Sequence, residues 1–242
     1  MKALGRLLLL VLCATLLLQL FFVARIAVMA WLDPESTSYQ RSEAWQLAHS
    51  SEGLRWRQQW VDYGQISSNL KRAVIASEDA GFMDHHGVEW DAVQRAWQRN
   101  AKAEARAMQA EKAGNNSKPA KVYGGSTITQ QLAKNLLLSG ERNFLRKGQE
   151  LVLAQLLELM LSKQRILEIY LNNVEWGQGV FGAEAAAQHY FRKSAAQLNA
   201  AEAARLAAML PAPKRFEKMP QSRYLAQRSR TIARYIPMVT PP

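Results

Sequence analysis

The chain is organised around one short stretch, Glu78-Asp79-Ala80-Gly81-Phe82-Met83-Asp84-His85-His86-Gly87. Two adjacent acids, a histidine seven residues after the first acid and two glycines surround one aromatic side chain. Carboxylates and imidazoles are the side chains that most often transfer protons in catalysis. We therefore predict that this stretch forms the rim of a catalytic site and not a packed helix face.

Residues 66–76 read Ile-Ser-Ser-Asn-Leu-Lys-Arg-Ala-Val-Ile-Ala, which predicts a helix that starts near Ser or Asn and carries Glu78 at its end. The apolar helix before Glu78 and the ring of Phe82 after it can exclude water from the carboxylate and raise its pKa. A general base needs such a tuned pKa. For an isolated Glu-Asp pair, a helix cap or an ion pair on the surface is the simpler interpretation. The motifs that follow along the chain favour the catalytic interpretation instead.

The 242-residue chain has room for one membrane anchor and one domain with a hydrophobic core. Lys and Arg outnumber Asp and Glu by 31 to 20, and the formal charge of +11 favours an acidic partner. A nucleic acid, an anionic lipid and a phosphorylated substrate all meet that requirement. The single cysteine, Cys13, lies in the apolar N-terminus, which excludes a disulfide framework and a Cys-based metal site in the rest of the chain.

Residues 7–32 are largely apolar, with Arg25 as the one charged interruption. A membrane-spanning helix needs about 20 apolar residues, and a long side chain such as Arg25 can reach the headgroups. Lys2 and Arg6 precede the apolar segment and favour a cytoplasmic N-terminus. The alternative is a signal peptide cleaved near residues 28–30, and both interpretations export the rest of the chain. The length of the segment favours the uncleaved anchor.

A second motif reads Gly124-Gly125-Ser126-Thr127-Ile128-Thr129-Gln130-Gln131-Leu132-Ala133-Lys134-Asn135. Two glycines open a turn, and Ser or Thr then caps a helix. A helix N-terminus with hydroxyls and free N–H groups suits a phosphate or a sugar. The motif is not a nucleotide P-loop, because no Gly-Lys-Ser/Thr ends it. Taken alone, a capped helix remains the simpler interpretation.

A third cluster contains Arg142, Arg146, Lys147 and Glu150. Three cations near one acid can bind a pyrophosphate, with the acid orienting them or a hydroxyl. The alternative is an exposed, salt-bridged helix start. Residues 151–161 are too short for a second membrane span and predict a central buried helix.

Two further segments, a charged one and an apolar one, have no clear catalytic pattern. Residues 90–113 predict a helix, and the charged stretch 101–121 predicts a solvated surface. The apolar residues at 136–138 and 144–145 fit either the core or an apolar lip that touches lipid. We leave both alternatives open for them.

The C-terminal third has a structural pattern. Residues 172–179 predict a glycine-containing turn, 183–191 and 200–210 predict helices rich in small residues, and 221–236 predicts a basic terminal helix. We interpret His189 as a packed side chain and not as a catalytic one.

Five motifs follow one another along the chain. They are the stretch 78–87, Gly-Gly-Ser-Thr-Ile-Thr-Gln-Gln at 124–131, Arg-Lys-x-x-Glu at 146–150, Lys-Gln-Arg-Ile-Leu-Glu-Ile-Tyr-Leu-Asn at 163–172 and Glu-Ala-Ala-Arg-Leu-Ala at 202–207. Over roughly residues 60–215 this set resembles the peptidoglycan glycosyltransferases of family 51. Because the sequence ends at Pro242, without room for a transpeptidase domain, it is similar to the monofunctional biosynthetic transglycosylases of that family.

The resemblance implies an all-α, mainly helical fold: a lysozyme-like, two-lobed glycosyltransferase domain with an N-terminal transmembrane helix and a small lobe that dips into the membrane. The chain would divide into a cytoplasmic tip and anchor (1–32), a linker and membrane-proximal segment (33–59) and a periplasmic glycosyltransferase domain (60–242). The implied location is the inner membrane, with a single pass and a cytoplasmic N-terminus.

The implied reaction is the polymerisation of lipid II, a disaccharide-peptide on undecaprenyl pyrophosphate, into β-1,4-linked glycan strands with inversion. By resemblance, Glu78 is the general base that deprotonates the acceptor's 4-hydroxyl, and undecaprenyl pyrophosphate is released. Glu150 matches the second family acid, which supports the phosphate site. The implied substrate-binding residues are Asp79, Phe82, His85, Ser126, Thr127, Gln130, Gln131, Lys134, Arg142, Arg146 and Lys147.

The resemblance also implies partners and cofactors. The partners would be lipid II, the growing lipid-linked glycan chain, the membrane, and proteins of cell-wall synthesis or division, with no nucleic acid among them. Mg²⁺ or another divalent cation could support the phosphate site, without metal ligands that the sequence identifies, and no organic cofactor is expected.

Two alternatives come from other functional classes. A lytic transglycosylase or lysozyme-type hydrolase also uses paired acids. It would not need the cation cluster or the anchor, because it cuts neutral glycosidic bonds. A membrane scaffold that binds anionic lipid or a cell-wall precursor would need the basic charge but not Glu78.

Overall fold

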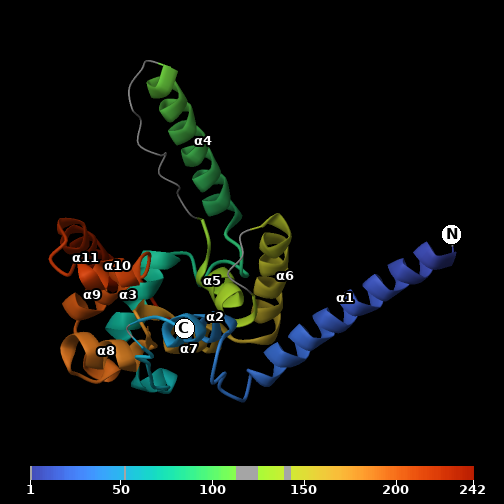
Figure 1. Ribbon diagram of the computed structural model, residues 1–242. Helices are drawn as coiled ribbons and strands as arrows, with labels where there is room; N and C mark the ends of the chain where they lie inside the picture. Colours follow the sequence, from blue (N-terminus) through green and yellow to red (C-terminus); the bar gives the residue numbers. More distant parts are fainter. Residues whose placement is uncertain (1, 52, 113–124, 139–142) are drawn as a thin grey trace.

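The computed structural model describes residues 2–51, 53–112, 125–138 and 143–242, which fold mainly into α-helices (Figure 1). The mainly helical fold predicted from the sequence is confirmed, as is a single apolar helix at the N-terminus of the described chain. The helical body contains a small three-stranded sheet that the sequence did not predict.

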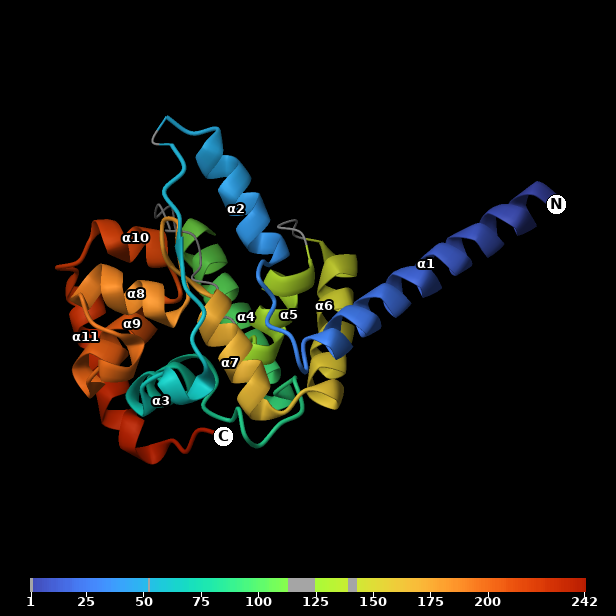
Figure 2. The same cartoon turned by 90° about the horizontal axis from the view of Figure 1, so that it is seen from below.

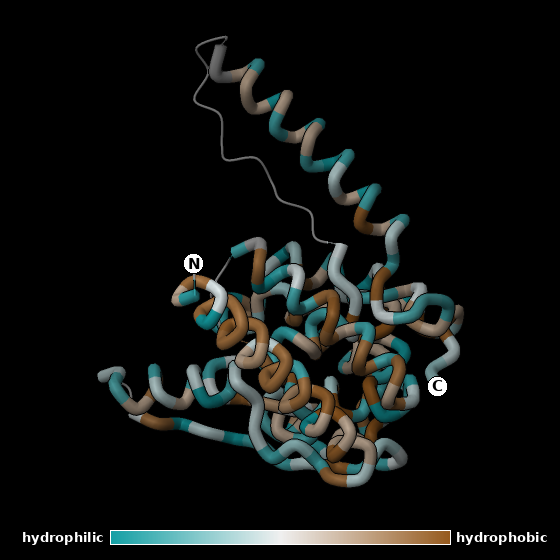
Figure 3. Tube along the Cα trace, turned by 90° about the vertical axis from the view of Figure 1, so that its right-hand side faces the viewer, coloured by the Kyte–Doolittle hydropathy of each residue, from teal (hydrophilic) through white to brown (hydrophobic). Residues whose placement is uncertain are grey.

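Helix α1 (Lys2–Val28) extends away from the body as an isolated rod (Figures 1 and 2). It contains 27 residues, reaches a mean hydropathy of 2.8, and is long and apolar enough to cross a membrane. Figure 3 shows hydrophobic residues along most of its length. Only its C-terminal part contacts the body, where Phe22 and Ile26 are buried and Gln19 exchanges two 3.0 Å hydrogen bonds with Gln149.

Helix α2 (Ser38–Ala48) begins at a capping box in which Thr37 and Gln40 each bond the other's backbone N–H. It packs on helix α5 (Ile128–Leu137), and the Ser38 hydroxyl donates to the Leu136 carbonyl at 3.1 Å. Residues 33–59, which we expected to be a linker and membrane-proximal segment, therefore contribute packed structure. The division of the chain at residue 60 stays a prediction.

The sheet combines β1 (Arg57–Gln58), β2 (Glu175–Gly177) and β3 (Val180–Phe181) in the order β1-β3-β2. β3 pairs antiparallel with β2 and parallel with β1. The predicted glycine-containing turn lies in this hairpin. Gly179 has a φ of +70°, and a Cβ there would lie 1.9 Å from the Arg55 carbonyl oxygen. Only glycine therefore lets β1 cross so close to the hairpin.

Helix α3 (Ser68–Glu78) begins at Ser67, whose side chain accepts a hydrogen bond from the Asn69 N–H, and ends at Glu78 as predicted. It packs on α9 (Ala200–Met209) and on the basic terminal helix α11 (Arg223–Tyr235). The alanines of α9 allow the two helix axes to approach closely.

The other helices complete the body or project from it. They are α6 (Phe144–Met160), α7 (Lys163–Asn173), α8 (Ala183–Phe191), α10 (Pro213–Lys218) and the 3-10 turns η1 (Tyr63–Gln65), η2 (Ala195–Gln197) and η3 (Ile236–Met238). Helix α4 (Trp90–Lys112) extends away from the body (Figure 1), in agreement with a solvated charged helix. The rest of the predicted charged stretch, up to residue 121, lies outside the described residues.

The apolar residues around 136–145 divide between two environments. Leu136 and Leu137 are buried in the core, whereas the Leu145 side chain is 88% exposed. The side chain at position 144 lies outside the described part of the chain. The core interpretation is thus right for the end of α5, and Leu145 remains available to an apolar surrounding.

We predict that Gly179→Ala destabilises the protein much more than Gly53→Ala. Both glycines have a positive φ, +70° and +71°, but a Cβ at Gly53 would meet no atom within 4 Å. The left-handed conformation costs an alanine about 1–2 kcal/mol, and the collision with Arg55 adds about 1–3 kcal/mol. Thermal unfolding of the two variants in the same detergent measures the difference. Equal losses would mean that β1 does not cross the hairpin at this distance.

Candidate active site

Glu78 is the last residue of α3 and is partly buried. The Gln131 side-chain amide donates to its Oε2 at 3.1 Å, and the Ser77 hydroxyl donates to its Oε1 at 3.1 Å. Burial raises the pKa of Glu78 above its ordinary value of 4.5. The two hydrogen bonds and the positive charge of Arg228 oppose that shift, and the charge of Asp79 adds to it. The net result is a carboxylate that holds a proton more tightly than an exposed one.

The amide of Gln131 is fixed by a third side chain. The Tyr170 hydroxyl, from α7, donates to the Gln131 Oε1 at 3.0 Å. The oxygen of the amide is therefore engaged by Tyr170, so its nitrogen points at Glu78. Tyr170 itself is fully buried, and burial raises its pKa well above 10.0, so its hydroxyl remains a donor.

Asp79 connects α3 to α5. Its Oδ2 accepts a 2.9 Å hydrogen bond from the backbone N–H of Ile128, the first residue of α5, and its Oδ1 lies 2.8 Å from His85 Nε2. A carboxylate at a helix N-terminus also interacts favourably with the helix dipole. Both carboxylate oxygens thus have partners inside the protein, and Asp79 holds the end of α3 against the start of α5.

Phe82 and Gly87 fold the rest of the stretch inward. The Phe82 ring is fully buried, and the Lys163 ammonium lies 4.5 Å from its centroid. Gly87 has a φ of +84°, and a Cβ there would lie 3.1 Å from the Ala154 carbonyl oxygen. The stretch therefore packs against α6, and Phe82, like Asp79, supports the site from within.

The second motif serves mainly as the N-terminal cap of α5. Thr127 Oγ1 accepts from the Gln130 N–H at 3.1 Å, and Gln130 Oε1 accepts from the Thr127 N–H at 3.0 Å. The Thr127 hydroxyl also donates to the Gly87 carbonyl at 2.6 Å. Ser126 and Gln131, on either side of this cap, are the residues of the motif whose side chains contact the charged groups of the site.

A cluster of charges forms on the first turns of α6, around Glu150. This buried carboxylate accepts from Arg146 Nη1 at 3.1 Å through Oε2 and from Lys147 Nζ through Oε1. Lys147 Nζ also lies 3.4 Å from the Ser126 hydroxyl. Because two cations share one acid, the cluster keeps a surplus positive charge. The expected salt-bridged helix start is therefore present, but its acid is buried and holds both cations in place.

The other two predicted cations are Lys134 and Arg142. Lys134 is an exposed residue of α5, and Arg142 lies outside the described residues. The structure thus brings together Arg146, Lys147 and Glu150 from the predicted phosphate group, with Ser126 beside them.

An open cavity of about 390 Å³ adjoins the cluster. Lys147, Ser126 and Gln130 line one side of it, and the apolar side chains of Trp90, Val93 and Trp97 on α4 line the other. A molecule that fills this cavity meets a cation and a hydroxyl on one side and apolar surface on the other. Such surroundings suit an amphiphilic ligand with an anionic group.

A divalent cation does not fit the described cluster. Both oxygens of Glu150 already accept hydrogen bonds from cations, which would repel a metal ion. Within the described ranges, no group of three or more His, Cys, Asp or Glu side chains could hold a metal ion.

Sequence reasoning missed the support of Glu78 by Arg228. Arg228 Nη2, on α11, donates to the carbonyl of Ser77 at 3.2 Å and lies 3.4 Å from its hydroxyl. That hydroxyl in turn donates to Glu78. No local pattern could reveal a contact between residues 151 positions apart. Tyr170, by contrast, lies in the motif at 163–172, but nothing in the sequence predicted its hydrogen bond to Gln131.

Comparison with known proteins adds an independent finding. Residues 46–236 match the model of a family described as transglycosylase. A curated protein named biosynthetic peptidoglycan transglycosylase from Paraburkholderia xenovorans is 52% identical over 221 residues, which cover 91% of this chain and 86% of that protein. Proteins of the same name from Bordetella pertussis and Bordetella avium are 50% and 48% identical, and cover 96% and 98% of this chain and 91% and 95% of their own lengths.

We predict that Glu78→Gln raises the thermal stability at pH 7. Because burial raises the pKa of Glu78, the folded chain binds this proton more tightly than the unfolded chain. The associated stability is complete below the unfolded pKa and is lost as the pH rises through the folded pKa. A neutral Gln avoids that loss. A gain of about 1 kcal/mol would raise the melting temperature by about 2–4 °C at pH 7, and the gain should vanish at pH 4.

Glu202→Gln provides the matched control. The Lys193 hydrogen bond lowers the pKa of Glu202, so its charge stabilises the folded state above the unfolded pKa. Glu202→Gln should therefore not raise the melting temperature at pH 7. A Glu78→Gln variant no more stable than the wild type at pH 7 would show that burying this carboxylate carries no cost.

Proposed function

The chain belongs to the transglycosylase family and is an enzyme of peptidoglycan synthesis, and from this premise we propose that it polymerises lipid II into β-1,4-linked glycan strands. One observation supports the proposal above all others. The first turn of α5 contacts the partly buried carboxylate of Glu78 through Gln131, and Ser126, the residue before the cap, contacts the cation cluster through Lys147. The start of α5 thus lies between a base and a group of cations. This arrangement suits the transfer of a sugar from a pyrophosphate to a hydroxyl, because the base can accept the hydroxyl proton and the cations can bind the pyrophosphate.

Glu78 acts as the general base in this proposal. It removes the proton from the 4-hydroxyl of the acceptor sugar as that oxygen attacks the anomeric carbon of the lipid-linked growing chain. The bond from that carbon to the pyrophosphate breaks, so the configuration inverts and the proton stays on Glu78. The raised pKa of Glu78 favours this role, because a base is most effective when its pKa lies near the working pH.

Arg146 and Lys147 stabilise the departing undecaprenyl pyrophosphate. Charge develops on the leaving group as the bond breaks, and fixed cations lower the energy of that state. Glu150 orients both cations, which would otherwise lose side-chain entropy when the substrate binds. Lys134 and Arg142 complete the predicted phosphate-binding set. The apolar residues of α4 across the adjoining cavity suit the lipid carrier.

The proposal also places the chain in the cell. Helix α1 would span the inner membrane once, with Lys2 and Arg6 on the cytoplasmic side and a catalytic domain, residues 60–242, in the periplasm. A lipid-linked substrate cannot leave the membrane surface, so an anchor keeps the site within its reach. The peptidoglycan precursor and the growing strand are the partners that this chemistry requires.

We expect Glu78→Gln to abolish polymerisation without abolishing lipid II binding. The amide cannot accept the hydroxyl proton, and loss of a general base typically costs a factor of about 10²–10⁴ in rate. Detergent-solubilised wild type and variant are incubated with purified lipid II, and the products are resolved by length. Glu202→Gln is the control that should polymerise normally. Full activity of Glu78→Gln would remove Glu78 from the role of base.

The same assay separates the alternatives. Preformed glycan strands that become shorter, with no polymer from lipid II, would indicate a lytic enzyme. No change in either substrate would indicate a scaffold.

We expect Arg228→Gln to move the acid limb of the polymerisation rate to higher pH. Arg228 lowers the pKa of Glu78, so its removal should raise that pKa further and leave the base protonated over a wider pH range. The pH dependence of the initial rate measures this shift. Arg230→Gln, an exposed arginine on the same helix, is the control and should leave the profile unchanged. If the two profiles coincide, Arg228 does not tune Glu78.

A further inference from the structure

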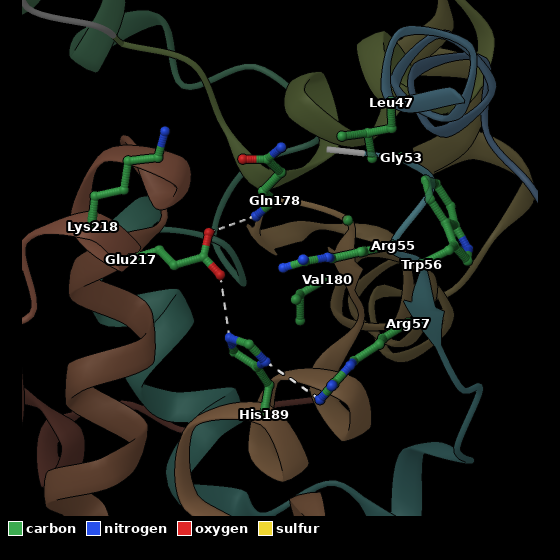
Figure 4. A pocket seen from close by; sticks show the side chains of 11 residues that line it. Leu47, Gly53, Arg55, Trp56, Arg57, Gln178, Val180, His189, Glu217 and Lys218 are labelled. Carbon is green, nitrogen blue, oxygen red and sulfur yellow. Dashed lines mark hydrogen bonds and ion pairs between the residues drawn. The ribbon is translucent and has the colours of Figure 1, made fainter. Parts of the chain in front are cut away.

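A second cavity lies between the small sheet, α8 and α10. Its volume is about 490 Å³, and Figure 4 shows the side chains that line it. None of the described residues that contact Glu78 or Glu150 is among them. The cavity is therefore separate from the proposed catalytic site, and the reaction described above leaves it unused.

Arginines from the strand β1 region form one side of the cavity. Arg55 and Arg57 both project into it (Figure 4), and Lys218 lies at its margin. Among the described residues, Arg55 and Lys218 have no ion-pair partner, and Arg57 contacts only His189 Nδ1, at 3.5 Å. Guanidinium groups without an internal acid are available to an external anion.

The opposite side is a fixed pair of Glu217 and His189. Glu217 accepts from the Gln178 backbone N–H at 2.8 Å, and its other oxygen lies 3.2 Å from His189 Nε2. The same imidazole thus lies between the Arg57 guanidinium, on its Nδ1 side, and the Glu217 carboxylate, on its Nε2 side. Glu217 is thus engaged by groups of the cavity wall, and among the described lining residues it is the one carboxylate beside the cations Arg55, Arg57 and Lys218.

The walls between these groups are apolar and aromatic. Trp56 stacks on Phe181 at a ring-centroid distance of 4.5 Å, so its ring is held in place. Leu47 and Val180 add aliphatic surface. The volume lies within the range of about 300–1,000 Å³ that is typical of small-ligand sites, and the mixture of walls suits a ligand with an anionic group on an otherwise uncharged body.

We propose that this cavity is a non-catalytic binding site for the carboxylate-bearing peptide of a peptidoglycan strand. The guanidinium forks of Arg55 and Arg57 match a carboxylate in geometry. The free lone pairs of the Glu217 carboxylate can in addition accept hydrogen bonds from peptide N–H groups. The inference rests on the proposed function, because that reaction brings peptide-bearing glycan to this protein. A strand held here remains attached to the enzyme at a point away from the reacting sugar.

The test uses the full chain in detergent and two soluble probes, a peptidoglycan disaccharide that carries its peptide and the same disaccharide without it. Titration calorimetry should show that the wild type binds the peptide-bearing probe at least 10-fold more tightly. The Arg55→Gln, Arg57→Gln double variant should lose at least 10-fold in affinity for that probe. Arg230→Gln, an exposed arginine outside the cavity, should bind like the wild type, and melting temperatures confirm that all variants fold.

Several results would overturn the proposal. Equal affinity for the two probes would exclude recognition of the peptide, and unchanged binding by the double variant would exclude the two arginines. Loss of binding in Arg146→Gln but not in the double variant would assign the probe to the catalytic site. Displacement of the probe by inorganic pyrophosphate in wild type and Arg146→Gln alike would identify a phosphate site. The titration contains no lipid II, so it tests the cavity whether or not the chain proves to polymerise lipid II.

Discussion

The carboxylate of Asp79 fixes the geometry on which the rest of the site depends. Its bond to the Ile128 N–H satisfies one of the free donors at the start of α5, and its contact with His85 holds the loop that follows α3. The end of α3 and the start of α5 cannot separate without breaking this hydrogen bond to a buried carboxylate, and a hydrogen bond to a charged group contributes about 1.5–3 kcal/mol. Glu78 lies at the end of α3 and Gln131 in the first turn of α5. By holding these two helix ends together, Asp79 places the two side chains within hydrogen-bond distance of each other.

The three acids of the site thus have three different roles, which follow from their surroundings. Asp79 bonds to a backbone N–H and a histidine and acts as a structural tie. Glu150 bonds to two cations and orients them. Among the residues that the structure describes, Glu78 receives its side-chain hydrogen bonds from the neutral groups of Gln131 and Ser77, and burial dominates its pKa. Neutral donors stabilise an ionised carboxylate less than cations do, so Glu78 is the acid of the three that environment prepares to take a proton.

Sequence reasoning succeeded where the signals are local. The helices that became α3, α8, α9 and α11 were predicted within a few residues, because caps, alanine content and prolines act within one or two turns. The small sheet was missed, because its strands have only two or three residues and β1 pairs with β3 across more than 100 positions. The family motifs predicted segments that the structure brings together around Glu78 and Glu150, but they did not predict which side chains in them only support others. Thr127 and Gln130 hydrogen-bond to each other, and Phe82 is buried, so these three residues support the site from within the protein. Such supporting residues can be distinguished from residues that can contact a substrate only once the folded structure is known.

The separation of charges between α3 and α6 has a chemical consequence. Opposite charges about 4 Å apart near a protein surface attract by about 4 kcal/mol, enough to keep a carboxylate ionised and make it a weak base. Were the cations of α6 to lie against Glu78, they would remove the proton affinity that general base catalysis requires. Among the described groups that shift the pKa of Glu78, however, the only cation is Arg228, and burial outweighs it. Glu150 keeps Arg146 and Lys147 on its own side of the α5 cap, so one site can combine a carboxylate with high proton affinity and a cluster with surplus positive charge. We therefore expect removal of Glu150 to disturb both the fixed cation cluster and the proton affinity of Glu78, because Arg146 and Lys147 would no longer be held by an acid of their own.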